Sequence, residues 1–402
     1  MAALKYWLWL TTRKGLGNQG AAMVLEQFGS PERAFFADPG EYDLMPRGVA
    51  AALRDRSMDA VERILGDCDR LGIRIMTRQD ADYPTRLHQL DDAPYVLYLK
   101  GNLPDFDEEA VIGVVGTRSA TEYGMSVAGR LGLELARGGA VVVSGTAAGI
   151  DTCAVRGVLK GGGNPVCVLG GGIDVPYPKG NRYLYEDVAA AGLLLSEYPP
   201  GTENHGPHFP IRNRIISGLS LGVVVVEAGE FGSGAVITAN HALDQGRDVF
   251  AVPGNVDAKE SRGCNRLIQQ GAKPVLGAED ILCEYRSRYP VKLTRNVPLD
   301  EAETAQRLQT AERVTSPGQP EAVAKPGPQP TKPCRSGQGL TDDELALLHA
   351  LGDKSLQADE LVEQTQIPAR RVLSALTMLQ IAGWLEERPG KRFAAIVQLT
   401  EE

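Results

Sequence analysis

The chain has 402 residues, of which 43% are hydrophobic and 23% charged, and this is the composition of a globular protein with room for two or three domains. Its net charge of -9 excludes a protein that coats nucleic acid over its whole surface, because such binding neutralises many phosphates with basic side chains. Any nucleic-acid site must therefore be a local basic patch.

The sequence indicates neither a membrane span nor a metal centre. No apolar run approaches the roughly 20 residues that cross a bilayer, and the start of the chain lacks a basic segment followed by a small-residue cleavage site. We therefore expect a cytoplasmic protein without a membrane partner. The six cysteines form no CxxC pair, so neither a disulfide framework nor a zinc site is expected.

Residues 1–100 are predicted to form a helical domain that ends in a short strand. Apolar residues recur at helical spacing in Ala21–Phe28, Ala50–Leu53 and Met58–Leu71. The turn Gly15-Leu16-Gly17 is similar to the hairpin of a SAM or helix-hairpin-helix module, where glycines let backbone amides approach a phosphate. A plain tight turn between packed helices accounts for the same glycines, and the sequence leaves both interpretations open.

Between residues 101 and 290, strands alternate with helical stretches, which predicts a Rossmann-like, doubly wound parallel sheet. The strands are expected at Ala110–Val115, Ala140–Ser144, Val166–Leu169, Leu193–Ser196, Gly222–Val226 and Asp248–Val252. Ligands of such sheets bind beyond the carboxyl ends of the strands. The loops at that edge are residues 116–119, 145–149, 170–172, 228–234 and 253–255, and several of them open a helix whose N-terminal amides favour an anion.

The first of these loops argues against a nicotinamide or flavin enzyme. Such an enzyme needs GxGxxG after the first strand and an acidic residue about 20 positions later. The chain has GVVGTRSATEYG instead, which supplies the wrong glycine spacing and inserts Arg118. The phosphate-binding motif GxxxxGK[ST] is also absent. We therefore expect no such cofactor and no nucleotide hydrolysis by a P-loop.

A basic segment stands out just before the strand that begins at Gly222. It contains two arginines around one asparagine, Arg212–Arg214, at the start of a predicted short helix. No acidic residue occurs between His205 and Val226, although the chain as a whole is acidic. This local excess of positive charge predicts an anionic ligand.

Arg118, Arg212 and Arg214 each follow a strand or lie close to the ligand-binding edge of the predicted sheet. Each guanidinium can bind phosphate oxygens through two parallel N–H bonds, and Phe209 beside them can stack on a base. For any one arginine the alternative is a surface salt bridge, and for Phe209 it is ordinary packing.

Other polar residues near this edge suggest no reaction. His205 and His208 have a spacing that suits a metal, but no third ligand converges on them, so we interpret them as solvated loop residues. Glu227 ends a strand without a neighbouring nucleophile and base. We expect it to orient an arginine or to accept hydrogen bonds from loop amides. No catalytic residue is predicted.

Seven segments resemble, in order and spacing, the DNA-processing protein A family (DprA/Smf): GVVGTRSATEYG, VVVSGTAAGIDTCAVRGVL, VCVLGGGIDVPYPKGNRYLY, LLLSEYPPG, FPIRNRIISGLS, VVVVEAGEFGSGAVITANHALDQGRDVFAVPGN and GCNRLIQQGA. The resemblance implies a homodimer that binds single-stranded DNA entering during natural transformation, protects it and loads the recombinase RecA onto it. It implies no catalysis and no cofactor.

The family's G-[ST]-R element matches Gly116, Thr117 and Arg118, and its F-x-x-R-N-R element matches the segment from Phe209 to Arg214. The DNA-binding residues implied in this way, with their neighbours in the edge loops, are Gly116, Thr117, Arg118, Ser144, Gly145, Phe209, Arg212, Asn213, Arg214, Glu227, Ser233 and Gly234. The chain departs from the family at two places, where Ala148 replaces an arginine and Val155 replaces a histidine.

Residues 291–339 are predicted to be a linker, with six prolines between Pro317 and Pro333. Residues 340–402 are predicted to form a winged helix with a recognition helix from Arg370 to Ala382. That segment holds 11 acidic and 6 basic residues, a net charge of -5 that opposes strong DNA binding. We favour a protein contact or an accessory role for it over insertion into a DNA groove.

Two other function classes stay open. One is a nucleotide-hydrolysing enzyme on a similar sheet, such as the Lonely Guy phosphoribohydrolases, although their PGGxGTxxE loop is not matched by EAGEFGSGAVITA. The other is a nucleotide-sensing module. Release of a base from nucleoside monophosphates would support the enzyme, and tight binding of a free nucleotide would support the sensor.

Overall fold

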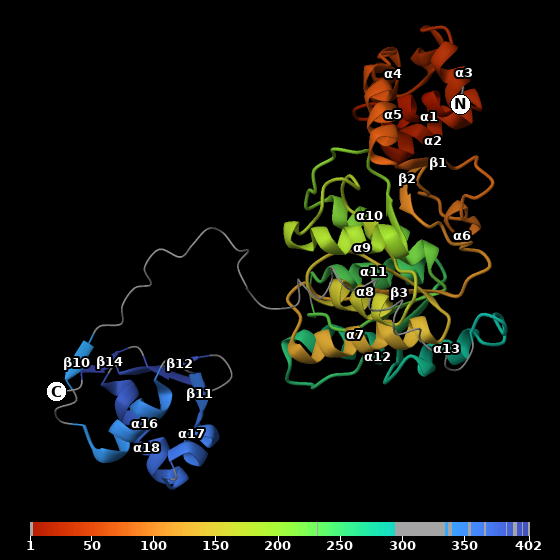
Figure 1. The fold of residues 1–402 in the computed structure, drawn as a ribbon. Helices are drawn as coiled ribbons and strands as arrows, with labels where there is room; N and C mark the ends of the chain where they lie inside the picture. The colour runs from red at the N-terminus through yellow and green to blue at the C-terminus, as the bar shows by residue number, and fades with distance from the viewer. Residues whose placement is uncertain are drawn as a thin grey trace. The chain divides into compact units, whose positions relative to one another are not determined.

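The computed structural model describes residues 3–230, 232–293, 334–336, 340–352, 355–365, 367–382, 384–388, 392–395 and 397–400. The chain divides into two compact units, Met1–Gly318 and Gln319–Glu402 (Figure 1). Most of the predicted linker, with all of its proline-rich part before Pro333, lies outside the described residues.

The first unit begins with short helices. They are α1 (Leu4–Thr11), α2 (Gly17–Phe28), α3 (Pro31–Phe36), the 3-10 helix η1 (Glu41–Leu44), α4 (Arg47–Arg54) and α5 (Asp59–Leu71). The α1–α2 turn contains Gly15 and Gly17, whose φ angles are 81° and 56°. A Cβ at either position would meet open space, so glycine is required there for the left-handed backbone rather than for close packing.

A nine-stranded sheet forms the centre of this unit, in the order β1-β2-β6-β5-β4-β3-β7-β8-β9. The strands are β1 (Arg74–Thr77), β2 (Val96–Gly101), β3 (Val111–Val115), β4 (Val141–Ser144), β5 (Val166–Leu169), β6 (Leu193–Ser196), β7 (Gly222–Val225), β8 (Asp248–Ala251) and β9 (Lys273–Pro274). Strands β3 to β9 pair in parallel, and the order reverses direction between β3 and β7. The predicted doubly wound sheet is thus confirmed, with each predicted strand within one residue of its position.

The sheet extends further toward the N-terminus than the sequence predicted. Residues 74–100, which we assigned to the helical domain with a short strand at its end, contain β1 and all but the last residue of β2, and β2 pairs antiparallel with β6. The apolar side chains of β2 are buried against the sheet edge, and this burial fixes the strand there. The helical region therefore ends at Leu71.

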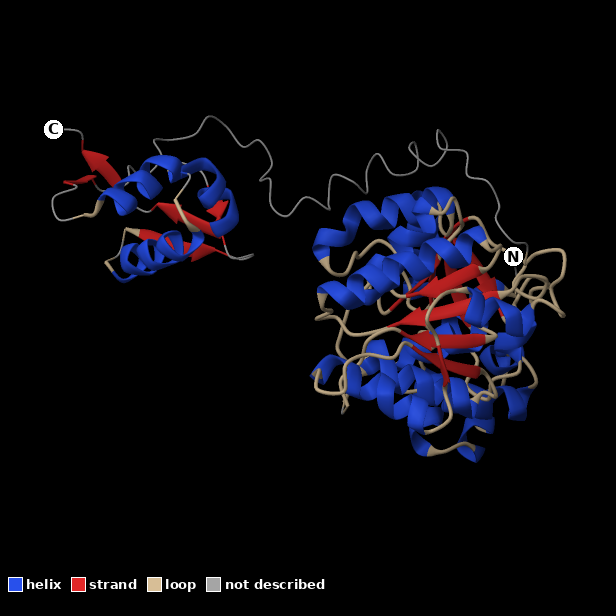
Figure 2. Ribbon diagram, turned by 90° about the horizontal axis from the view of Figure 1, so that it is seen from below, coloured by secondary structure: helices blue, strands red, loops and turns tan. Residues whose placement is uncertain are grey.

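Helices cover both faces of the sheet (Figure 2). Buried side chains of α7 (Glu122–Arg137), α8 (Ile150–Lys160) and α13 (Glu279–Tyr285) pack on one face. Those of α10 (His208–Leu219), α11 (Gly234–Asp244) and α12 (Arg262–Gln269) pack on the other. The remaining helices of this part are α6 (Thr85–His88), α9 (Arg182–Ala191), and the 3-10 helices η2 (Lys179–Asn181) and η3 (Lys259–Ser261).

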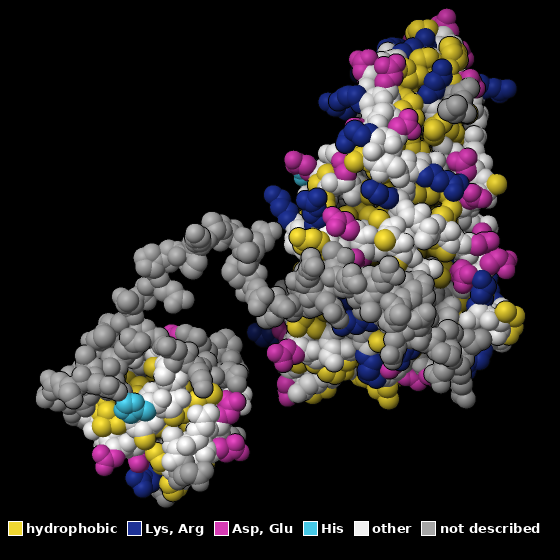
Figure 3. Space-filling model, viewed as in Figure 1, with side chains coloured by type: hydrophobic (Ala, Val, Ile, Leu, Met, Phe, Trp, Pro, Cys, Tyr) yellow, Lys and Arg dark blue, Asp and Glu magenta, His cyan; other side chains and the backbone are white. Residues whose placement is uncertain are grey.

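Charges of both signs are interspersed on the described surface that Figure 3 shows, and no extended patch of one sign covers it. This agrees with the acidic composition, which leaves room only for a local basic site.

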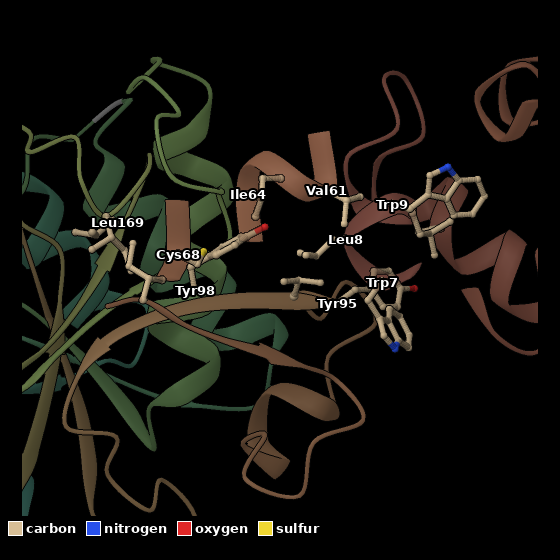
Figure 4. Close-up of a cluster of buried hydrophobic side chains, with 14 of the residues drawn as sticks. Trp7, Leu8, Trp9, Val61, Ile64, Cys68, Tyr95, Tyr98 and Leu169 are labelled. Atoms are coloured by element: carbon tan, nitrogen blue, oxygen red, sulfur yellow. The ribbon is translucent and has the colours of Figure 1, made fainter. Parts of the chain in front are cut away.

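One buried cluster joins the N-terminal helices to the sheet (Figure 4). Trp7 stacks on Tyr95 with ring centroids 5.8 Å apart and an angle of 22° between the rings. Leu8 and Trp9 are fully buried in the same cluster as Leu169 of β5. The helical region and the sheet are therefore packed as one body.

The second unit has the predicted winged-helix arrangement. Its helices are α16 (Asp342–Leu351), α17 (Ala358–Thr365) and α18 (Ala369–Ile381), and its three-stranded sheet pairs β11 (Ser355–Gln357), β13 (Arg392–Ala395) and β12 (Leu385–Arg388). Strands β10 (Cys334–Ser336) and β14 (Gln398–Thr400) form a separate parallel pair. Thr341 and Glu344 form a capping box that begins α16.

One described basic residue of this unit, Arg371, is already paired within it. Arg371, at the start of α18, donates two hydrogen bonds to Asp343, at 2.8 and 2.7 Å. This pair neutralises one of the arginines predicted near the recognition helix. Residues 389–391 lie outside the described residues.

Within the described part of the chain, no helix is long and apolar enough to cross a membrane. The same residues contain no group of three or more His, Cys, Asp or Glu side chains that could hold a metal ion.

Candidate nucleic-acid interface

A cavity of about 520 Å³ opens at the carboxyl edge of the sheet, where the strand order reverses between β3 and β7. Its walls are the loop after β3 and the first turns of α8, α10 and α11. The predicted site residues that line it are Gly116, Thr117, Arg118, Phe209, Arg212, Asn213, Ser233 and Gly234. Ser144, Gly145, Arg214 and Glu227 do not line it, and each has a different position.

Arg118 is the exposed cation of the cavity. Its guanidinium carbon lies 4.3 Å from the centroid of the Phe209 ring and 5.9 Å from that of Tyr177. The two rings are themselves in contact, with centroids 5.0 Å apart and an angle of 46°. Among the residues that the structure describes, no carboxylate forms an ion pair with Arg118. A charged planar group thus lies over two aromatic rings, within reach of a phosphate from solvent.

Arg212 lies deeper, with 5% of its surface exposed. Its Nε donates a hydrogen bond of 3.1 Å to Asn213 Oδ1, and its Nη1 donates to the Val168 carbonyl. Burial lowers the pKa of Arg212, and the nearby Asp151 carboxylate opposes that shift. The guanidinium still stays protonated, because its unperturbed pKa is far above neutral.

Asp151, in the first turn of α8, is the acidic residue that faces Arg212. Burial raises the pKa of Asp151 to about 6, although Arg212 and the Ala147 amide lower it. At neutral pH the carboxylate is therefore mostly ionised, and it compensates the buried guanidinium beneath the cavity.

Gly145 makes this pairing possible. A Cβ on Gly145 would overlap both Asp151 Oδ2 and Arg212 Nη1. Ser144 is fully buried, and its hydroxyl donates a hydrogen bond of 2.6 Å to the Val114 carbonyl. The structure thus places these two residues under the cavity, where they support Arg212, rather than on its surface.

Glu227 fastens the loop that carries Arg118. Its Oε2 accepts a hydrogen bond of 2.9 Å from the Thr121 amide, and its Oε1 accepts one of 2.7 Å from the Thr121 hydroxyl. The same hydroxyl accepts from the Gly124 amide and caps α7. A Cβ on Gly124 would overlap the Glu227 carboxylate, so the helix approaches this closely only with glycine. Glu227 accepts from a loop amide, as the sequence suggested.

Arg214 faces away from the cavity. Its Nη2 donates to both carboxylate oxygens of Glu197, at 2.7 and 2.8 Å, and its Nε lies 3.1 Å from Asp92 Oδ2. Residues two positions apart on an α-helix point roughly 200° apart, so Arg212 and Arg214 cannot face the same cavity. Phe209 and Arg212, three positions apart, can.

The sequence missed two neighbours of the site. Asp151 occurs in the GIDTCAVRG segment but was not singled out, and its position just after a glycine-rich loop at a helix start is the signal that could have found it. Tyr177 sits between two prolines in the loop after β5. Of the two departures from the family pattern, Ala148 is exposed, whereas Val155 is fully buried in the core and does not line this cavity.

Comparison with known proteins settles the family. Residues 74–286 match the model of DNA recombination-mediator protein A, and residues 329–391 match that of the DprA winged helix domain. The chain belongs to the DNA-processing protein A family. The resemblance recognised in the sequence is thereby confirmed.

Relatives in this family match most of the chain. Protein Smf of Synechocystis is 32% identical over 402 residues, covering 96% of this chain and 98% of that protein. The DNA processing protein DprA of Bacillus subtilis is 43% identical over 242 residues, covering 60% of this chain and 81% of that protein. The X-ray structure of DprA from Streptococcus pneumoniae has a TM-score of 0.61 and 36% identity, and it covers 70% of this chain and 97% of that one.

Proposed function

We propose that this member of the family binds single-stranded DNA at the carboxyl edge of its sheet and acts as a recombination mediator without catalysis. The observation that carries the proposal is Arg118 over the rings of Phe209 and Tyr177, beside the buried Arg212. Binding of a single strand requires cations for the phosphates and ring faces for the bases, and it requires no reactive group.

The other walls of the cavity suit the same ligand. The N-cap residue of α11, Ser233, and its first residue, Gly234, line the cavity, so the amides of this helix start favour an anion there. Asn213 holds that start in place by donating a hydrogen bond of 3.2 Å to the Gly234 carbonyl. We assign phosphate contacts to Arg118 and Arg212, and we assign a supporting role to Arg214 because Glu197 already engages its guanidinium.

The cavity offers no group of residues for hydrolysis. Among the described residues that line it, Asp151 is the acidic one, and Arg212 faces its carboxylate. A nucleotide hydrolase of the Lonely Guy type needs an acid or base that is free to act on substrate. The binding function is therefore the one we favour.

Family membership supports a finer role. We propose that the chain protects DNA entering during natural transformation and loads RecA onto it as a homodimer. Support comes from the match of residues 74–286 to the recombination-mediator family. A strand-exchange assay with RecA, with and without this protein, tests the loading step.

The binding site is tested with the Arg118→Ala variant and an oligothymidylate followed by fluorescence anisotropy. Loss of a charge-assisted contact of about 1.5–3 kcal/mol predicts at least a roughly tenfold weaker affinity, with no change in thermal stability. Arg63→Ala is the matched control, because Arg63 is an exposed arginine on α5. Affinity should also fall with added salt. Equal affinity of the Arg118→Ala protein and the wild type would refute the site.

A further inference from the structure

We propose that Tyr198, His208 and His205 form a second base-stacking step, which receives the next part of a single strand as it leaves the cavity. This inference rests on the proposed function and adds to it a path for the strand. The three residues, called the ring row below, do not line the cavity itself.

The ring row is already ordered as an aromatic stack. Tyr198 and His208 have ring centroids 4.2 Å apart and an angle of only 16°, which is a face-to-face arrangement. His205 meets His208 edge-on, with centroids 5.3 Å apart and an angle of 85°. His205 is exposed, whereas the other two rings are half-buried. The sequence suggested that both histidines are merely solvated, and for His208 the stacking shows otherwise.

The ring row begins directly beside the cavity. His208 and Phe209 are consecutive residues at the start of α10, and both contact Gly170 in the loop after β5. His208 Nδ1 lies 2.9 Å from the Gly170 carbonyl oxygen, and a Cβ on Gly170 would lie 3.1 Å from Phe209 Cδ1. The loop that contains Gly170 thus contacts Phe209, which lines the cavity, and His208, which is the central ring of the row. A strand whose base lies on Phe209 is therefore delivered next to His208.

The ring row lies among acidic side chains, so it can receive a strand only through its bases. Glu197, next to Tyr198, pairs with Arg214, which also pairs with Asp92, so only one of these two negative charges is offset. Glu203 of the β6–α10 loop is exposed, and so is Asp174, which accepts a hydrogen bond from the Gly201 amide of that loop. A step that binds bases by stacking keeps the phosphates turned outward, away from these carboxylates.

Oligothymidylates of increasing length separate the ring row from the cavity. The measurement uses the full chain, with His205→Ala as one variant and His205→Ala/His208→Leu as another. Short oligomers that fill only the cavity should bind the variants as they bind the wild type. Longer oligomers should bind the double variant roughly tenfold more weakly, which is the usual effect of one lost aromatic stack. Tyr183→Ala is the matched control, because Tyr183 is 43% exposed on α9 outside the row.

A second readout identifies stacking itself. A 2-aminopurine base placed along the oligothymidylate should lose fluorescence at the position that meets the ring row, and His205→Ala should restore that fluorescence. His208→Phe retains a ring and should keep long-oligomer affinity, which excludes a purely ionic role. His205 is exposed, so its replacement does not disturb the core.

The outcomes separate this inference from the proposed function. If the wild type binds long oligomers and the ring-row variants bind them equally well at every length, the ring row is not part of the path. If the wild type binds oligothymidylate with no dependence on Arg118, the proposed site itself fails.

Discussion

Position 145 requires glycine because two buried side chains occupy the space that a Cβ would take. Because a Cβ there would overlap Asp151 and Arg212, Gly145→Ala should push the buried pair apart. Overpacking of this kind costs about 1–3 kcal/mol, and displacement of Arg212 should also weaken oligothymidylate binding. Denaturant unfolding and anisotropy measure the two effects. Gly206→Ala is the control, because Gly206 lines the same cavity but has open space at its Cβ position; comparable losses in both variants would contradict this explanation.

Asp151 gives stability a specific pH dependence. Burial raises its pKa from 3.8 to about 6, so the folded state binds the proton more tightly than the unfolded state. The contribution of the Asp151 carboxyl to the free energy of unfolding is complete below about pH 3.8. It is lost as the pH rises through 6, a change of roughly 3 kcal/mol. The stability of the wild type relative to Asp151→Asn should therefore fall between pH 4 and pH 7. Urea unfolding at both pH values checks the sign, and a flat difference would show that the carboxylate titrates normally.

At the scale of single residues, the sequence predicted which side chains cluster but not how each one is used. Phe209 and Arg212 were found because their spacing and basic context are visible in the chain. The partners of Arg214 were not, since Glu197 and Asp92 come from distant segments and only the helix phase turns Arg214 toward them. Asp151 was missed for a similar reason, because its burial against Arg212 exists only in the folded chain.

Between elements, Glu227 links the end of β7 to the start of α7. Glu227→Gln replaces one accepting oxygen with an amide donor, which cannot accept from the Thr121 amide or hydroxyl. We expect a loss of about 1–3 kcal/mol in the free energy of unfolding and weaker DNA binding, because the same loop carries Arg118. Glu122→Gln on the exposed first turn of α7 is the control. If the Glu227→Gln protein is less stable but binds DNA with full affinity, the hydrogen bonds of Glu227 stabilise the fold without affecting the DNA site.

Most strands of the sheet could be predicted from the sequence. Runs of valine and leucine bounded by glycine-rich loops predict central parallel strands, and β3 to β8 lie within one residue of their expected positions. The antiparallel addition of β1 and β2 could not be predicted in this way. A short apolar run such as Val96–Gly101 does not say which strand it will join, and its partner β6 lies far along the chain.

At the scale of the whole molecule, the described residues contain separate cores. The clusters of the first unit draw on residues up to Leu293, and one of them ties the N-terminal helices to the sheet. The cluster of the second unit includes Leu347, Leu361, Leu376 and Trp384, and none of its described members comes from the first unit. The described part of each core therefore comes from its own unit alone.

This division predicts the effect of removing the winged helix. A chain that ends after Arg295 retains the sheet, its two helical layers and every basic side chain assigned to the DNA site. It should keep the melting temperature of the first unit and most of the affinity for oligothymidylate, since the removed residues 296–402 have a net charge of -5.

Calorimetry and anisotropy on the truncated and full chains test this expectation. A loss of more than about tenfold in affinity, or roughly 1.4 kcal/mol, at an unchanged melting temperature would mean that the winged helix contacts DNA. Arg371→Ala in the full chain then tests whether Arg371 makes that contact. Because Arg371 is paired with Asp343, we expect its removal to have little effect on oligothymidylate affinity.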